Sequence, residues 1–208
     1  MQFQPILEAI AEEMRPQLGS GIVASYIPAL ARVPAAQFGI ALVSMDGQIA
    51  AAGSAHTPFS IQSISKVFSL TLAMRLVCEQ QLWDRIGREP SGDPFNSLVQ
   101  LEHEHGVPRN PLINAGAIAV ADRLVSACKD PKGEILAMMS ELCGEPIRYD
   151  EEVAASEAAT GFRNIALANF MKSFGKLDNP VDRVLDVYFH QCALAMTCAQ
   201  LARAASYL

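Results

Sequence analysis

A serine hydroxyl and a lysine amine stand three residues apart in the segment Ser63-Ile-Ser-Lys66. On a helix, residues at this spacing share one face with Cβ atoms about 5–6 Å apart, so the amine can reach the hydroxyl. The residues that follow are almost uniformly apolar, and burial lowers the pKa of a lysine, which lets its neutral amine accept the serine proton. A helix N-terminus also favours an oxyanion. The pattern predicts a nucleophilic serine with a lysine general base.

Other serine and lysine pairs in the chain share this spacing, so context has to separate them. The chain has five lysines, and two besides Lys66 follow a serine by three residues, in the pairs Ser126/Lys129 and Ser173/Lys176. Both lie where a helix is expected to end, which is typical of solvated charges. Only Lys66 begins an apolar helix. An N-cap serine beside a lysine that extends to solvent remains the structural alternative for this pair.

The four histidines do not form a pattern typical of a catalytic or metal site. Glu102-His-Glu-His105 ends at Gly106, and residues two apart on a helix do not face the same way, which favours a solvated helix end over a metal cluster. His56 and His190 have no partner at a diagnostic spacing, so a Ser-His-Asp arrangement is not supported. We therefore predict no metal site.

The elements that must position Ser63 and Lys66 begin with an amphipathic helix at the N-terminus, carrying Phe3, Leu7, Ile10 and Met14 at helical spacing. A β-hairpin is predicted over 38–52, around the turn signal Asp46-Gly47. The segment 63–79 is apolar on every side, so we expect it to be the buried central helix of the fold.

The rest of the chain is predicted to be mainly helical. The segment 83–111 is rich in loop residues with a helical stretch over 96–105, and further helices are expected over 113–128, 134–143, 161–174, 179–188 and 192–208. Only the hairpin gives confident strands, whereas an independently stable sheet needs about three. We expect an α+β protein, with residues 1–208 in a single domain and an incomplete sheet.

Composition excludes several classes of protein. Half of the 208 residues are hydrophobic and 18% are charged, which excludes intrinsic disorder. The net charge of −6, without a basic cluster, argues against a nucleic-acid partner. No apolar stretch is long enough for a membrane span and no signal-peptide pattern occurs, so we expect a cytoplasmic protein. So few charges also favour a homo-oligomer, with apolar surface buried between subunits.

The five cysteines are predicted to be reduced thiols in the core. Their number is odd, none forms a Cys-x-x-Cys pair, and each lies in an apolar stretch; they are Cys78, Cys128, Cys143, Cys192 and Cys198.

A set of short motifs occurs in order from position 26 to the end of the chain. They are Tyr26-Ile-Pro-Ala-Leu-Ala, Phe59-Ser-Ile-Gln-Ser-Ile-Ser-Lys, Glu89-Pro-Ser-Gly, Phe95-Asn-Ser, Pro108-Arg-Asn-Pro, Ile113-Asn-Ala-Gly-Ala-Ile, Ser156-Glu157, Arg163-Asn164 and Val184-Leu-Asp-Val-Tyr-Phe-His-Gln-Cys. Together they resemble the serine-dependent glutaminases. This match is far more specific than the serine and lysine spacing alone.

The resemblance implies a β-lactamase-like fold, with an antiparallel sheet backed by helices and a helical lobe beside it. It implies hydrolysis of L-glutamine to L-glutamate and ammonia, without a cofactor. Ser63 would be the nucleophile that forms a γ-glutamyl ester, Lys66 its general base and later proton donor, and Tyr188 an active-site tyrosine. The residues that would bind substrate with Ser63 and Tyr188 are Asn114, Glu157, Asn164, Tyr26 and Gln62.

The family pattern also includes segments that do not occur among these 208 residues. These are further strands of the sheet, a second active-site tyrosine and a Gly-rich segment that completes the oxyanion hole. Two alternatives therefore stay open beside the hydrolase. One is a non-catalytic chain that binds glutamine or folds only as an oligomer. The other is a penicillin-recognising serine acylase, which shares the Ser-x-x-Lys pair and is expected to carry further motifs that do not occur here.

Overall fold

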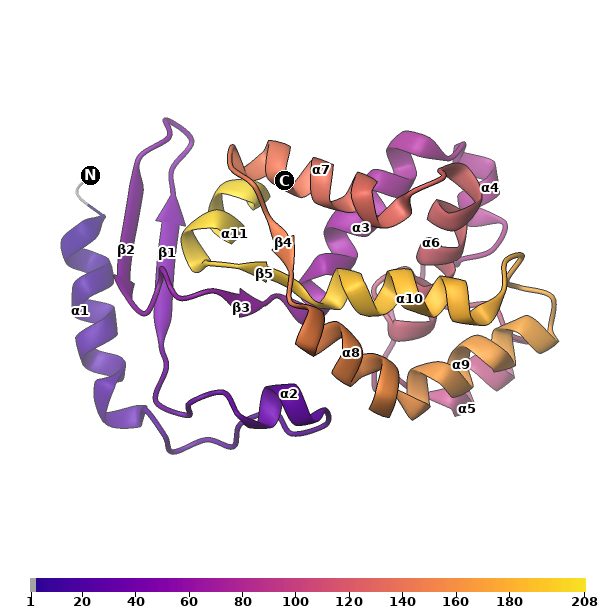
Figure 1. Cartoon of the computed structure of the whole chain (residues 1–208), viewed down its shortest axis with the longest axis horizontal. Helices are drawn as coiled ribbons and strands as arrows, with labels where there is room; N and C mark the ends of the chain where they lie inside the picture. Colours follow the sequence, from indigo (N-terminus) through magenta and orange to yellow (C-terminus); the bar gives the residue numbers. More distant parts are fainter. Residues whose placement is uncertain (1–2) are drawn as a thin grey trace.

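The computed structural model describes residues 3–208, which form an elongated molecule with a hairpin at one end and a body of helices at the other (Figure 1). Helix α1 (Gln4–Met14) lies along strand β2 (Ile49–Gly53), which pairs with β1 (Gly39–Val43). Leu7 is the buried residue of α1, in agreement with the predicted amphipathic helix. A short helix, α2 (Pro28–Ala31), follows in the long connection from α1 to β1.

The predicted hairpin is confirmed. Strands β1 and β2 are antiparallel, and their register runs from Gly39 opposite Gly53 to Val43 opposite Ile49. Gly47 has a φ of +83° in the connecting turn, a conformation that glycine adopts without the steric cost other residues meet.

A second, three-stranded antiparallel sheet was not predicted. It has the order β3-β5-β4 and consists of β3 (Phe59–Ser60), β4 (Arg148–Tyr149) and β5 (Leu194–Met196). Strands of two or three residues are too short to leave an alternating pattern in a sequence. This sheet connects the end of the hairpin segment to the helical body (Figure 1).

The predicted helix over 192–208 is wrong at its beginning, because strand β5 intervenes. The helix there, α11, spans Cys198–Ala204, and a short 3-10 turn (Ala205–Tyr207) follows it. Thr197 explains the boundary, since its side chain accepts a hydrogen bond from the backbone N–H of Gln200 while the Gln200 side chain accepts from the N–H of Thr197. This reciprocal capping fixes the first turn of α11.

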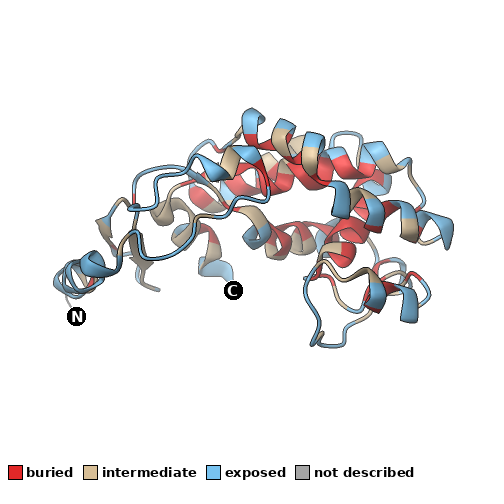
Figure 2. Cartoon of the chain, turned by 90° about the horizontal axis from the view of Figure 1, so that it is seen from below, coloured by how far each residue is buried: buried red, intermediate tan, exposed pale blue. Residues whose placement is uncertain are grey.

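The helical body contains most of the buried residues of the described chain (Figure 2). Its helices are α3 (Ser65–Leu76), α4 (Glu79–Trp83), α5 (Leu98–His103), α6 (Asn114–Ala127), α7 (Pro131–Cys143), α8 (Glu151–Thr160), α9 (Phe162–Ser173) and α10 (Val181–Cys192). All of these helices except α8 overlap a segment predicted to be helical, although α4 overlaps only the end of the segment 63–79. Helix α8 was not predicted. Helix α9 ends at Gly175 as predicted, where a φ of +65° lets Lys176 N–H donate to the carbonyl of Met171.

The central helix is α6, and the expectation that the segment 63–79 holds this place is wrong. Eleven residues of α6 are buried, whereas Met74 and Leu76 near the end of α3 are 60% and 44% exposed. Small side chains allow α6 to be enclosed. A Cβ atom at Gly116 would lie only 1.9 Å from the carbonyl oxygen of Asn110, so the close approach of that loop requires glycine.

The turn before α10 is held by a buried carboxylate. Asp122 on α6 is fully buried and accepts hydrogen bonds from the backbone N–H groups of Asp178 and Asn179, at 3.1 and 2.9 Å. It also pairs with Arg123, which bonds Asp178 in turn. These bonds fix the start of α10 against the central helix.

The five cysteines are free thiols, but they are not all in the core. Cys143 and Cys192 are buried, Cys128 and Cys198 are partly exposed, and Cys78 is exposed at the end of α3. The prediction of a core thiol is therefore wrong for Cys78. Among the described residues, no helix is long and apolar enough to cross a membrane.

Candidate active site

A cavity of about 500 Å³ lies where the turn before α3 meets helices α6, α8, α9 and α10. Seven of the eight residues singled out from the sequence line it: Tyr26, Gln62, Ser63, Asn114, Glu157, Asn164 and Tyr188. The eighth, Lys66, reaches the same place through a hydrogen bond to Asn114. Segments up to about 160 residues apart in the chain therefore bring all eight residues together.

Ser63 lies in a 3-10 turn, Gln62–Ile64, directly before helix α3. Gln62 has a φ of +48°, in the left-handed region that side chains other than glycine rarely adopt, and such strained residues cluster at functional sites. The hydroxyl of Ser65 donates to the Gln62 carbonyl at 2.6 Å. The Ser63 side chain is thereby exposed toward the cavity at the N-terminal end of a twelve-residue helix.

Lys66 is buried, with 3% of its surface exposed, and its amine bonds only neutral oxygens. The Nζ atom donates to Oδ1 of Asn114 at 2.7 Å and to the carbonyl of Leu112 at 3.0 Å. Asn114 in turn donates from Nδ2 to Oδ1 of Asn164 at 3.0 Å. Burial lowers the pKa of Lys66 to about 8, so its amine loses a proton far more readily than that of an ordinary lysine.

Glu157 is a buried carboxyl group at the cavity, only 3% exposed. Within residues 3–208 its carboxylate makes no hydrogen bond or ion pair, and burial raises its pKa to about 7. A buried carboxylate is stable when a cation or several donors compensate its charge. The cavity is thus suited to a ligand that carries a positive group.

Two tyrosines complete the polar lining. Tyr26 is 62% exposed, and its hydroxyl donates to Oε1 of Gln62 at 2.9 Å. Tyr188 is 2% exposed, and burial raises its pKa well above 10. The Tyr188 hydroxyl therefore stays protonated at neutral pH and is available as a hydrogen-bond donor.

The cavity has seven further lining residues to which the sequence analysis assigned no role: Ile27, Phe95, Asn96, Thr160, Gly161, Arg163 and Cys192. Cys192 follows Tyr188 by one helical turn, and this spacing could have indicated it. Arg163 and Phe95 are exposed, and their place in the motifs Arg163-Asn164 and Phe95-Asn-Ser could have indicated them. Arg163 and Glu157 are the two charged residues of the lining.

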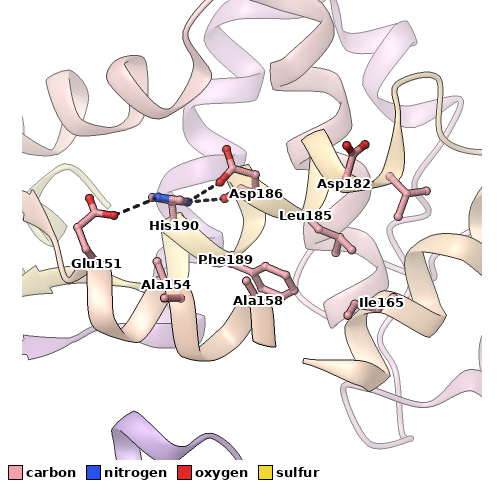
Figure 3. Close-up of a pocket in the computed structure, with 11 residues that line it drawn as sticks. Glu151, Ala154, Ala158, Ile165, Asp182, Leu185, Asp186, Phe189 and His190 are labelled. Carbon is pink, nitrogen blue, oxygen red and sulfur yellow. Dashed lines mark hydrogen bonds and ion pairs between the residues drawn. The ribbon is translucent and has the colours of Figure 1, made fainter. Parts of the chain in front are cut away.

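A second, more apolar groove of about 660 Å³ lies between α8, α9 and α10 (Figure 3). His190 lies at one end, with Nδ1 2.7 Å from the carbonyl oxygen of Asp186, one turn earlier on α10, and Nε2 3.6 Å from Glu151. The other lining residues are Ala154, Ala155, Ala158, Ile165, Val181, Asp182, Leu185 and Phe189. The lining of this groove contains no serine, cysteine or lysine.

Comparison with known proteins agrees with this geometry. The sequence model of the family described as Glutaminase matches residues 21–208. The chain belongs to the glutaminase family. A glutaminase of Methylorubrum extorquens is 58% identical over 99% of this chain, and one of Rhodopseudomonas palustris is 59% identical over the whole of it.

Solved glutaminase structures have the same fold. The crystal structure of a probable glutaminase from Bacillus subtilis matches 96% of this glutaminase chain with a TM-score of 0.85 and 34% identity. A structure described as Mglu in its glutamate form matches 98% with a TM-score of 0.89 and 32% identity. The expected β-lactamase-like fold, with helices and small antiparallel sheets, is thereby confirmed.

The chain spans only part of these relatives. It covers 67% and 68% of the two curated glutaminases, and 62% and 47% of the two solved chains.

Proposed function

We propose that this glutaminase chain hydrolyses L-glutamine to L-glutamate and ammonia through an acyl-enzyme on Ser63. The observation that carries the proposal is the cavity itself. Its lining contains a serine at a helix N-terminus and a buried carboxylate without a partner, and a buried amine with a pKa of about 8 is hydrogen-bonded to the lining residue Asn114. Membership of the family supports the reaction.

In the first step, the Ser63 oxygen attacks the side-chain amide carbon of glutamine. The serine proton passes to the neutral amine of Lys66, and the positive end of α3 favours the negative charge that develops on the carbonyl oxygen. Lys66 then gives this proton to the leaving nitrogen. The carbon–nitrogen bond breaks, ammonia leaves and a γ-glutamyl ester of Ser63 remains.

In the second step, water attacks the ester carbon and gives a proton to Lys66. The ester bond to Ser63 breaks, the serine oxygen takes up the proton, and glutamate leaves. The Tyr188 hydroxyl is neutral and buried, so in this scheme it donates a hydrogen bond to an oxygen of the reacting group instead of acting as a base.

The cavity also matches the two charges of the free amino acid. Glu157 would take the α-ammonium group, because its carboxylate has no cation of its own in residues 3–208. Amide and hydroxyl donors of Asn164 and Tyr26, with Arg163 at the rim, would take the α-carboxylate. Because Glu157 is buried, an analogue without the α-ammonium group would leave its carboxylate uncompensated and should be rejected.

The experiment is ammonia and glutamate release from L-glutamine by the 208-residue chain and by Ser63→Ala. We expect release by the parent chain and a loss on the order of 10⁶ in kcat in the variant. Ser173→Ala is the matched control, since Ser173 also precedes a lysine by three residues but is exposed on α9. It should leave turnover unchanged.

The outcomes separate the open alternatives. A Ser63→Ala chain with parental turnover would rule out Ser63 as the nucleophile. A chain that binds glutamate but releases no ammonia would instead be a non-catalytic binding protein. Stable acylation of Ser63 by a labelled penicillin, without glutamine turnover, would favour a penicillin-recognising acylase.

Assembly and location remain predictions. We propose that residues 1–208 act as one catalytic domain, that copies associate as a dimer or tetramer, and that the protein is cytoplasmic. Exposed large side chains such as Phe162, 72% exposed on α9, support association. Light scattering of the purified chain measures the number of subunits.

A further inference from the structure

Phe95 is an aromatic residue whose exposure and position differ from those of a core side chain. It lies in the connection between α4 and α5, where the sequence Gly92-Asp-Pro-Phe forms no helix or strand, and it is 64% exposed. Its ring nevertheless lines the cavity at Ser63. Functional residues often lie on loops, so an exposed aromatic ring on a loop that also lines a polar cavity is a candidate functional residue.

Two contacts connect Phe95 to the amine and to the amide that holds it. The ring centroid lies 5.5 Å from Nζ of Lys66, within the range of a cation–π interaction. The carbonyl oxygen of Phe95 accepts a 2.8 Å hydrogen bond from the backbone N–H of Asn114, the first residue of α6. Asn114 also accepts the 2.7 Å bond from Lys66. The three residues therefore form one closed set of contacts.

The loop that carries Phe95 is held on both sides of the ring. Before it, the hydroxyl of Ser91 donates to Gln100 at 2.8 Å, and Asn110 donates from Nδ2 to the carbonyl of Glu89 at 2.9 Å. After it, Ser97 caps α5. The backbone of Phe95 is thus fixed, although its ring is mostly exposed. The ring is placed over the amine by the loop and not by a hydrophobic core.

We propose that Phe95 is a positioning residue whose ring covers the amine of Lys66 and sets how readily that amine gives and takes a proton. This inference rests on the proposed function, in which the Lys66 amine is the base. The ring acts in two opposite ways. Its face attracts the ammonium form, and its bulk excludes the water that would otherwise solvate that form.

Four other side chains of the site lie near the Lys66 amine and are not changed by a substitution at Phe95. Cys192 and Tyr188 on α10 and Glu157 on α8 belong to the same cavity, and Asn114 on α6 bonds the amine directly. Burial is the main cause of the lowered pKa of Lys66, and the nearby Cys192 opposes it. A change at Phe95 leaves all four groups in place, so its effect on the amine can be measured separately.

The two actions of the ring predict that the titration midpoint of the Lys66 amine shifts in opposite directions in two variants. Phe95→Leu keeps an apolar cover and removes the aromatic face, so the titration midpoint of the Lys66 amine should fall by about half to one pH unit. Phe95→Ala opens the amine to water, so the midpoint should rise. Phe95→Tyr keeps both ring and cover and should restore the parental midpoint.

The experiment is a pH titration of the chain carrying ¹³Cε-labelled lysine, followed by NMR, with the Lys66 signal assigned by its loss in Lys66→Met. Only five lysines contribute signals. Phe162→Leu is the matched control, because Phe162 is 72% exposed and lies between cavity residues without lining the cavity. It should not move the midpoint. Thermal melts of each variant check folding.

The results decide the proposal in both directions. A fall in Phe95→Leu, a rise in Phe95→Ala and the parental value in Phe95→Tyr support it. Midpoints that stay at the parental value, or that move the same way in the leucine and alanine variants, overturn it. Because the titration needs no turnover, a chain that fails to hydrolyse glutamine but shows the opposite shifts would refute the proposed function and not the role of Phe95.

Discussion

The amine of Lys66 is held at 2.7 Å by the side-chain oxygen of Asn114, a neutral acceptor. A carboxylate at this place would stabilise the ammonium form and keep the lysine protonated, whereas an amide orients the amine without adding a charge. Asn114 also donates to Asn164, so its oxygen and nitrogen cannot exchange places without losing both hydrogen bonds. The orientation of the Lys66 amine therefore depends on an asparagine that begins the central helix.

Asn114→Asp tests this relationship, because it replaces the amide with a carboxylate of nearly the same shape. We expect the pKa of Lys66 to rise by about one to three pH units, since an opposite charge within hydrogen-bond reach favours the charged form. Turnover of glutamine at pH 7 should fall at least about tenfold, and the acid limb of kcat/KM should move to higher pH. Asn169→Asp, on the exposed face of α9, is the control. An unchanged pH profile would contradict the proposed base.

Glu157 gives a prediction about stability. Its pKa is raised to about 7 by burial, above the ordinary value of 4.5. The folded chain thus favours the protonated carboxyl group, so this group's contribution to stability is complete below about pH 4.5 and is lost as pH rises through about 7. Glu157→Gln removes the titration. The free energy of unfolding of Glu157→Gln, relative to that of the parent, should rise by up to about 3 kcal/mol between pH 4.5 and 7 and stay constant above pH 7.

Urea unfolding at pH 4.5, 6 and 8 measures this difference. Glu141→Gln, exposed on α7, is the control and should show no such trend. The same Glu157→Gln chain should bind glutamine far more weakly at pH 8, because the ammonium group loses its carboxylate. A variant that is less stable than the parent at pH 8 would contradict the assignment of Glu157 as an uncompensated buried charge.

The hydroxyl of Tyr26 gives a smaller and more local effect. It donates to Gln62 at 2.9 Å in the turn that carries Ser63, and the Tyr26 side chain is 62% exposed. Tyr26→Phe should leave the melting temperature unchanged and raise the KM for glutamine about three- to tenfold, the cost of one hydrogen bond. Tyr207→Phe is the matched control, because its hydroxyl also makes one bond, to Thr71, but lies outside the cavity. Equal effects of the two variants would remove Tyr26 from the site.

Much of the site could be predicted because its residues belong to short motifs that keep their order along the chain. The helices that hold Lys66, Asn114 and Tyr188 were all predicted, since each is rich in apolar residues. Gly175 ended α9 as expected. The sequence could therefore indicate both which residues meet at the cavity and which elements carry them.

The rest depended on contacts between distant segments. Strand β5 has three residues and pairs with β3 and β4, and no local pattern announces such a strand. The segment 63–79 seemed central because it is apolar, but the small residues of α6 let that helix pack more closely on its neighbours. Phe95 belongs to the motif Phe95-Asn-Ser, but no local pattern indicated a role for its side chain, which lines the cavity and lies near the amine of Lys66.

Asp122 is expected to contribute most to stability among the polar residues outside the cavity. Its buried carboxylate accepts the backbone N–H groups of Asp178 and Asn179 and pairs with Arg123. Asp122→Asn removes the charge and leaves Arg123 with less compensation, so the free energy of unfolding should fall by about 3 kcal/mol in a urea titration. Asp182→Asn, exposed at the start of α10, should cost less than about 0.5 kcal/mol. The lost bonds hold the turn that begins α10. Turnover should therefore be lower in Asp122→Asn than in Asp182→Asn, even at temperatures where both variants are folded. A variant as stable and as active as the control would show that the start of α10 is fixed by its apolar packing alone.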